Sequence, residues 1–347
     1  MRTSMALALA LAAPLASQQP TVVEQVSGVR ATLMAVSPVS ESVVWASGSA
    51  GMVVRTRDGG TTWESHSVPD GVTDRLGFRG IHAISVDEAW VMSSANGPAT
   101  RIYHTVDGGT TWKEQYRATD AAMFLDCIAF FDAKHGVAFS DVASPGITIL
   151  RTDDGGEHWN LLAPGAAPAA LKGEGAFASS NSCISITDKT HAVLVAGTPG
   201  GRVFRTTDAG ATWTLAGAAP VIHDTAAGPT AISFRDGRHG ILVAGIIGRG
   251  VMTRDTVPNA VATTDDGGTT WTLRHRPTQP GMLSGVTLLP AVSDGTAITA
   301  TYTGLHVSRD NGESWASVAT GYYWAVKSFG KRAWAVGNGG KITRLDF

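Results

Sequence analysis

Short apolar runs, rich in β-branched and aromatic residues, recur along almost the whole chain. Examples are SVVWAS at 42–47, GMVVR at 51–55 and GITILR at 146–151. Runs of four to eight such residues between Gly- and Asp-rich turns are typical of β-strands. The 3.6-residue spacing of amphipathic helices is not found in residues 19–347. The pattern predicts an all-β protein.

One eight-residue motif, T/S-x-D-x-G-x-T/S-W, returns six times after such runs, beginning with TRDGGTTW at 56–63. Its aspartates are 44 to 58 residues apart, and the third copy has His158 where the others have Thr or Ser. The motif aspartates are Asp58, Asp107, Asp154, Asp208, Asp266 and Asp310. The closing tryptophans are Trp63, Trp112, Trp159, Trp213, Trp271 and Trp315.

Each motif has three β-like runs before it and one after it, and four short strands in 40–50 residues is the pattern of a propeller blade. The motif therefore falls in the turn between the third and fourth strands. Asp-Gly pairs suit such turns because Gly tolerates positive φ. We expect the aspartates to accept hydrogen bonds from the turn, and the tryptophans to pack between blades. A catalytic or calcium-binding role is not indicated, because a calcium loop needs further acidic ligands.

Six motifs predict six blades, and the chain then continues with YWAVKSF, RAWAVG and GKITRL before it ends. These three runs match the first three strands of another blade. TVVEQVS at 21–27 can supply its fourth strand. The prediction is a single seven-bladed β-propeller over residues 19–347, closed by both termini, with no open sheet edge.

Residues 1–18 have the pattern of a cleavable signal peptide, with Arg2 before an apolar run from Met5 to Leu15. We therefore expect export to a periplasm or to the exterior. No stable membrane insertion is expected, because no run is long enough. A net charge of −2 without a Lys/Arg cluster argues against nucleic acid as a partner. We expect a monomer.

The two cysteines, Cys127 and Cys183, fall at matching places in the first strands of blades three and four. Matching side chains should point the same way around the ring, one following the other instead of facing it. We therefore expect them to remain unbonded, although an exported chain favours disulfides.

The repeated motif resembles the Asp-box, or BNR, repeat of sialidases, sortilin-type receptors and xyloglucan hydrolases. FRGIHAISVDEAWVMSS, FLDCIAFFDAKHGVAFSD and GEGAFASSNSC look closest to the family of the photosystem II assembly and stability factor and its exported bacterial relatives. The resemblance implies a propeller that binds other proteins during assembly without catalysis, and no cofactor. His158 departs from the repeat and implies a looser third turn.

A glycoside hydrolase is the alternative, since sialidases are built on such propellers. A sialidase needs an arginine triad, a Tyr/Glu nucleophile pair and an acid, for which Tyr322, Tyr323, Glu174 and Asp141 are available. However, the Phe-Arg-Ile-Pro element of sialidases is absent. Xyloglucan hydrolases use a cleft between two propellers, and this chain has the length for one.

No zinc, Ser-hydrolase or Walker motif is found, so neither a metal nor a cofactor is predicted.

Blade topology puts the longest loops on the face opposite the motif turns. These loops are 67–80, 140–146, 162–177 and 245–259. Long irregular loops at one mouth of a rigid ring suit recognition of a protein or small ligand. The candidate binding residues there are Arg79, Asp126, Asp141, Glu174, Arg249, Arg254 and Asp255.

Overall fold

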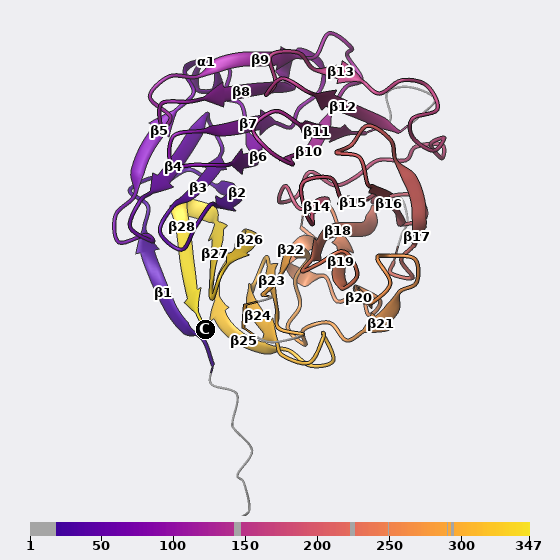
Figure 1. Cartoon of the computed structure of the whole chain (residues 1–347). Helices are drawn as coiled ribbons and strands as arrows, with labels where there is room; N and C mark the ends of the chain where they lie inside the picture. The colour runs from indigo at the N-terminus through magenta and orange to yellow at the C-terminus, as the bar shows by residue number, and fades with distance from the viewer. Residues whose placement is uncertain (1–18, 142–146, 223–225, 249, 290, 293–294) are drawn as a thin grey trace, which may run out of the picture.

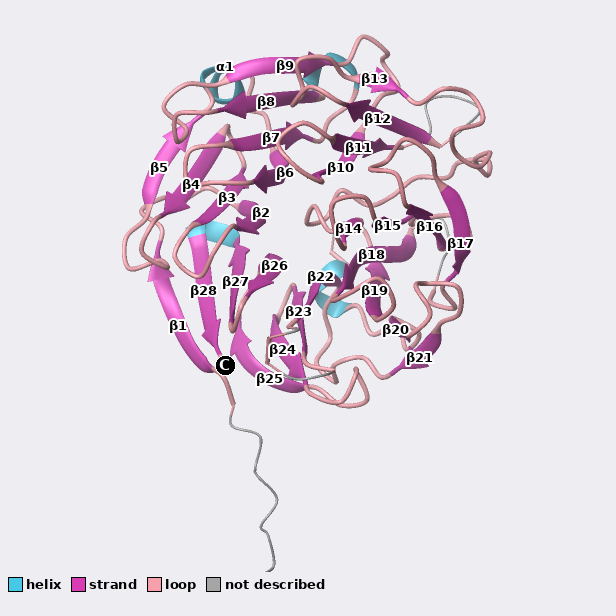
Figure 2. Cartoon of the chain, viewed as in Figure 1, coloured by secondary structure: helices cyan, strands magenta, loops and turns pink. Residues whose placement is uncertain are grey.

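The computed structural model describes residues 19–141, 147–222, 226–248, 250–289, 291–292 and 295–347. The predicted signal peptide and Arg249 lie outside these residues. The described chain forms seven four-stranded antiparallel sheets arranged as blades around a central channel (Figures 1 and 2). The predicted seven-bladed propeller is confirmed.

In blades 1 to 6 the chain begins at the channel and moves outward strand by strand. Blades 1 to 3 consist of β2 (Leu33–Pro38), β3 (Val44–Gly48), β4 (Met52–Thr56), β5 (Glu64–Ser67); β6 (Phe78–Ala83), β7 (Ala89–Ser93), β8 (Arg101–Thr105), β9 (Lys113–Arg117); and β10 (Leu125–Phe130), β11 (Gly136–Ser140), β12 (Thr148–Thr152), β13 (Asn160–Leu161).

Blades 4 to 6 consist of β14 (Ile184–Ile186), β15 (Ala192–Val195), β16 (Arg202–Thr206), β17 (Thr214–Ala218); β18 (Ala227–Phe234), β19 (Gly240–Ile246), β20 (Val261–Thr264), β21 (Thr272–Arg274); and β22 (Leu283–Leu288), β23 (Ala297–Thr301), β24 (Gly304–Ser308), β25 (Ala316–Thr320). The short helices of the described residues lie in connections: α1 (Pro69–Thr73), η1 (Gly97–Ala99), η2 (Met252–Arg254) and η3 (Asn338–Gly340). None of them is long and apolar enough to cross a bilayer.

Blade 7 joins the two ends of the described chain, as predicted. It consists of β26 (Tyr323–Phe329), β27 (Arg332–Gly337), β28 (Lys341–Asp346) and, outermost, β1 (Thr21–Val26). β1 pairs with β28 in register from Thr21 opposite Asp346 to Val26 opposite Lys341. This pairing closes the ring and covers the edge that β28 would otherwise expose.

The hydrophobic core lies between the blades, in clusters that each join two neighbouring blades. The motif tryptophans belong to these clusters. Trp213, for example, is 3% exposed and packs with Val137 of blade 3 and Leu194 of blade 4. Burying large aromatic rings between sheets stabilises the ring as a whole.

Each motif forms a turn between the third and fourth strands of its blade, on one face of the ring, which we call the Asp-box face. In the first copy, Thr56 donates to Oδ1 of Asp58 (2.8 Å), and Thr62 donates from its backbone N–H to Oδ1 (2.9 Å) and from its hydroxyl to Oδ2 (2.7 Å). The hydrogen bonds from Thr62 lower the pKa of the Asp58 carboxyl to about 2.

The third turn keeps the same contacts despite its histidine. The backbone N–H of His158 donates to Oδ1 of Asp154 (3.0 Å), and its ring Nδ1 lies 2.7 Å from Oδ2. These bonds lower the pKa of Asp154 to about 2. The imidazole thus replaces the usual hydroxyl, and the turn does not open.

Cys127 and Cys183 form a disulfide, with Cα atoms 6.1 Å apart, so the expectation of unbonded thiols is wrong. The two positions are equivalent, as inferred, but the innermost strands converge at the channel. Small residues occupy this position in the other blades: Ala35, Gly80, Ala231, Gly285 and Ala325. At so short a radius, equivalent side chains of neighbouring blades come within disulfide range.

Candidate functional site: the channel cavity on the loop face

The innermost strands share an irregularity that builds the site. In six blades the pairing of the first strand with the second skips one residue, which is a β-bulge. The skipped residues are Met34, Arg79, Asp126, Thr230, Ser284 and Trp324. A β-bulge changes the direction of the side chain at the skipped residue. Because the bulge falls at the same position in six first strands, the skipped residues lie at the same level of the channel.

A segment between β13 and β14, residues 173–183, crosses the channel; we call it the crossing segment. Ser179 donates to the carbonyl of Ser284 in blade 6 (2.7 Å). Asn181 donates to the carbonyls of Ile81 (3.0 Å) and Ile128 (3.1 Å) in blades 2 and 3. These contacts with three blades fix the segment, which becomes the floor of the cavity above it.

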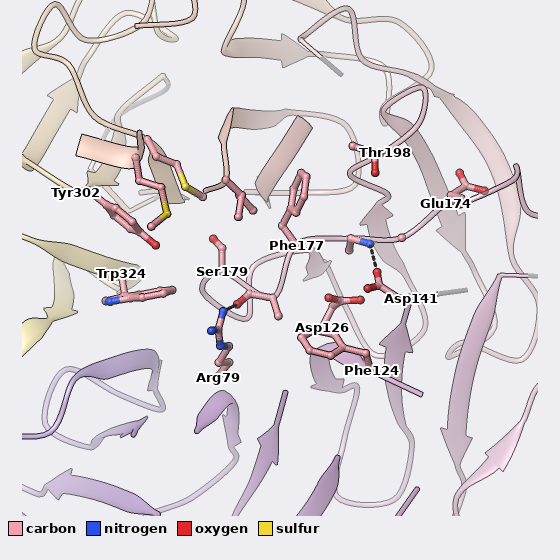
Figure 3. Close-up of a pocket in the computed structure, with 17 residues that line it drawn as sticks. Arg79, Phe124, Asp126, Asp141, Glu174, Phe177, Ser179, Thr198, Tyr302 and Trp324 are labelled. Atoms are coloured by element: carbon pink, nitrogen blue, oxygen red, sulfur yellow. Dashed lines mark hydrogen bonds between the residues drawn. The ribbon is translucent and has the colours of Figure 1, made fainter. Parts of the chain in front are cut away.

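The cavity has a volume of about 520 Å³ and opens on the face opposite the Asp-box face, which we call the loop face. Its walls come from three of the six bulge residues (Arg79, Asp126 and Trp324), the crossing segment and the loops that follow second strands (Figure 3). Most of the lining is apolar, as in ligand sites generally. The apolar and aromatic lining residues include Phe124, Phe177, Ile247, Met252, Met282, Tyr302 and Trp324.

Arg79 supplies a positive charge beside an aromatic wall. Its guanidinium lies 5.3 Å from the ring centre of Trp324 and donates from Nη1 to the carbonyl of Ala178 (2.9 Å). Within the described chain, no carboxylate lies within 4.0 Å of Arg79, and its Nε and Nη2 make no hydrogen bond. These donors are available to an anionic or carbonyl group of a ligand.

Asp126 and Asp141 place two carboxyl groups on the opposite wall (Figure 3). Asp126 is 1% exposed, and neither of its carboxylate oxygens accepts a hydrogen bond from an N–H or hydroxyl group of the described residues, although its carboxyl adjoins that of Asp141. Burial, and then the neighbouring charge of Asp141, raise the pKa of Asp126 well above its usual value. Burial also raises the pKa of Asp141, which accepts a hydrogen bond from the backbone of Ala176 (3.2 Å). An unpaired buried carboxyl is costly unless a ligand pairs with it.

Glu174 lies in the wall but is already paired. It is 1% exposed, forms a salt bridge with Arg202 and accepts a hydrogen bond from the backbone of Leu171 (2.9 Å). It holds the crossing segment in place and is not offered to a ligand.

Arg254 and Asp255, two other predicted residues, do not line the cavity. Asp255 is 3% exposed and pairs with Arg276 (3.1 Å), so it supports the loop from within. Arg254 is exposed on η2. Loop length showed which face is variable, but not where these side chains point.

Of the four residues considered for a sialidase-like site, Asp141 and Glu174 line the cavity, but Tyr322 and Tyr323 do not. Tyr323 donates or accepts at its hydroxyl with Thr343 (2.7 Å), between the strands of blade 7. Tyr322 stacks on Tyr302 with ring centres 4.1 Å apart. Arg79 is the one arginine among the described residues that line the cavity, so a triad is not present there.

Sequence reasoning missed Trp324, Tyr302 and the two methionines. A signal for Trp324 existed, because aligning the first strands puts it at the position of Arg79 and Asp126. Within the described residues, no group of three or more His, Cys, Asp or Glu side chains could hold a metal ion.

Solved structures share this architecture at low sequence identity. YCF48 bound to a D1 peptide is 17% identical, with a TM-score of 0.65 over 96% of this chain and 98% of that chain. Virginiamycin B lyase from Staphylococcus aureus, solved with quinupristin as a catalytically inactive variant, is 13% identical, with a TM-score of 0.67 over 95% and 100%.

A GH74 xyloglucanase from Xanthomonas campestris is 15% identical, with a TM-score of 0.61 over 93% of this chain but 53% of that chain. No protein-family model and no curated protein sequence matches the chain. These similarities establish the propeller fold. They include binding proteins and enzymes alike, so function has to be argued from the cavity.

Proposed function

We propose that this chain is an exported, non-catalytic propeller that binds a short segment of a partner protein, or a small ligand, in the loop-face cavity. The observation that carries the proposal is that one apolar cavity holds both the Arg79 guanidinium, which has free donors, and the buried carboxyl of Asp126, which accepts no hydrogen bond from an N–H or hydroxyl group of the described residues. Its setting would be the assembly or stabilisation of an envelope complex, as the sequence resemblance suggests.

The chemistry of the walls describes the ligand. A carboxylate or backbone carbonyl would bind Arg79, and an apolar side chain would lie on Trp324 and Tyr302. An N–H or ammonium group would bind the Asp126–Asp141 pair, which offers acceptors. A peptide segment carries all three groups within a few residues. YCF48, which shares the fold, has been solved with a peptide bound.

Selection of peptides on the immobilised protein tests the proposal without a known partner. A library of random dodecapeptides would be selected on the chain from residue 19 onward. Enriched peptides would then be measured against Arg79→Gln, Trp324→Ala and the control Arg254→Gln, which changes an exposed arginine outside the cavity.

We expect each cavity variant to weaken binding by about tenfold or more, corresponding to about 1.4 kcal/mol. The control should bind as the unmodified protein does. Peptides that bind all variants equally would contradict the proposed site.

A hydrolase is the second candidate, favoured by one observation, the neighbouring carboxyl groups of Asp126 and Asp141 with raised pKa values. Glycosidases place two carboxyl groups about 5–10 Å apart on either side of the scissile bond. Here the two carboxyls adjoin each other on one wall, which suits joint binding of a donor better than flanking a sugar bond.

A panel of sialidase and xyloglucan substrates decides between the two candidates. We expect no turnover above that of the Asp126→Asn, Asp141→Asn double variant. Turnover that this variant abolishes would establish the hydrolase instead.

A further inference from the structure

The channel contains a second cavity below the crossing segment, toward the Asp-box face. It has a volume of about 290 Å³. Its wall includes one residue from the first strand of each blade. In the six blades with a bulge this residue lies three positions after the skipped residue, and in blade 4 it lies at the equivalent position. Together these residues form the lower ring, which consists of Ser37, His82, Ala129, Ser185, Ser233, Thr287 and Lys327.

The lower cavity carries uncompensated positive charge. Lys327 projects into it, and no described residue places a carboxylate within 4.0 Å of its ammonium or accepts a hydrogen bond from it. No Asp or Glu is found among the described residues that line the cavity. Arg235 also lines it, but its guanidinium is paired with Asp236 (3.4 Å). Burial lowers the pKa of Lys327 to about 8, and burial and then Lys327 lower the pKa of His82 to about 4.

Three serines of the lower ring have hydroxyl groups that donate no hydrogen bond to another described residue. Ser37, Ser185 and Ser233 each accept a hydrogen bond from a backbone N–H of a neighbouring blade, at 3.0, 3.0 and 3.1 Å. Because a hydroxyl has one hydrogen to donate and two lone pairs, each can still donate. Among the described residues, none of the three makes such a donated bond.

We propose that the lower cavity binds a small oxyanion, phosphate or sulfate, between the ammonium of Lys327 and the hydroxyls of Ser37, Ser185 and Ser233. These donors come from blades 1, 4, 5 and 7 and line the same cavity. Tetrahedral oxyanions accept several hydrogen bonds at once, and charge-assisted ones are the strongest. The site is separated from the loop-face cavity by the crossing segment, so it stands independently of the proposed peptide binding.

Calorimetric titration with inorganic phosphate, and separately with sulfate, tests the site at constant ionic strength maintained with sodium chloride. We expect saturable binding at one site per chain. Lys327→Met keeps the side-chain length and removes the charge, and it should weaken binding by at least tenfold. Lys341→Met is the matched control, because Lys341 is in the same blade but pairs with Glu24 outside the channel (3.2 Å).

Ser185→Ala should weaken binding severalfold, because it removes one donor and leaves the charge. Folding of each variant is checked by its melting curve without phosphate. Retained binding in Trp324→Ala would show the independence of the two cavities. The absence of saturable binding to the unmodified protein, or equal affinity in Lys327→Met, would overturn the proposal.

Discussion

The two faces of the ring are built by opposite rules. On the Asp-box face, one turn is repeated six times with the same hydrogen bonds, even where His158 replaces a hydroxyl residue. On the loop face, the equivalent bulge position carries a different side chain in almost every blade, with Arg79, Asp126 and Trp324 among them. Repetition supplies a scaffold, and departure from repetition supplies a binding site.

The largest effect is expected from opening the ring. Removing residues 20–28 deletes β1 and exposes the edge of β28. We expect aggregation or loss of cooperative unfolding, measured by light scattering and a urea titration. A chain that starts at residue 19 is the control. A truncated chain that unfolds like this control would show that β1 does not close the ring.

Removing the disulfide should come second. Cys127→Ala with Cys183→Ala introduces the residue found at this position in blades 1, 5 and 7 and removes a crosslink over 56 residues. Chain entropy predicts a loss of about 4 kcal/mol in the free energy of unfolding. Denaturant titration measures it, and an unchanged midpoint would contradict the crosslink. Alkylation without reductant, followed by mass spectrometry, should find no free thiol in the unmodified protein.

Replacing a single Asp-box aspartate should lower the stability less, because the other five turns keep their hydrogen bonds. Asp266 accepts hydrogen bonds from Thr264, Thr269 and Thr270. Asp266→Ala should therefore lower the Tm by about 2–4 °C. Asp265→Ala removes the same charge from an exposed neighbour and should change the Tm little. Equal effects of both substitutions would mean that charge, not the turn, is responsible.

The smallest effect on stability is expected from Asp126→Asn, which should raise the Tm instead of lowering it. A carboxyl whose pKa is raised in the folded state lowers stability as the pH rises from the unfolded value through the folded value. Asp126→Asn should therefore raise the Tm at pH 8 relative to the unmodified protein, and by less at pH 4. A calorimetric pH series measures this. A gain in Tm that is larger at pH 4 than at pH 8 would contradict a raised pKa of Asp126.

The repeated features were readable from the sequence because each blade supplies an independent copy of the same signal. Six motifs and a split seventh blade were enough to predict the strands, the turns and the closure. The structure places Arg79, Asp126 and Asp141 in the wall of the loop-face cavity; their role as binding residues stays a prediction.

The sequence did not reveal the disulfide or the crossing segment. The first depends on the small radius of the ring at the channel, and the second on a stretch of sequence that is not repeated in the other blades. The cysteines were placed at equivalent positions, but the convergence of inner strands at the channel is not visible in a linear alignment. The crossing segment has no counterpart in other blades, so nothing indicated that residues 173–183 would form a floor. Asp255 was misjudged because its salt-bridge partner, Arg276, lies in the next strand connection.

In this protein, we propose, the bulge residues of the cavity bind a ligand and the Asp-box residues stabilise the fold. The direct test measures, for each variant, the calorimetric Kd of a selected peptide and the Tm. We expect Trp324→Ala to raise the Kd at least about tenfold with little change in Tm, and Asp266→Ala to lower the Tm with an unchanged Kd. Loss of affinity in Asp266→Ala at an unchanged Tm, with full affinity in Trp324→Ala, would contradict it.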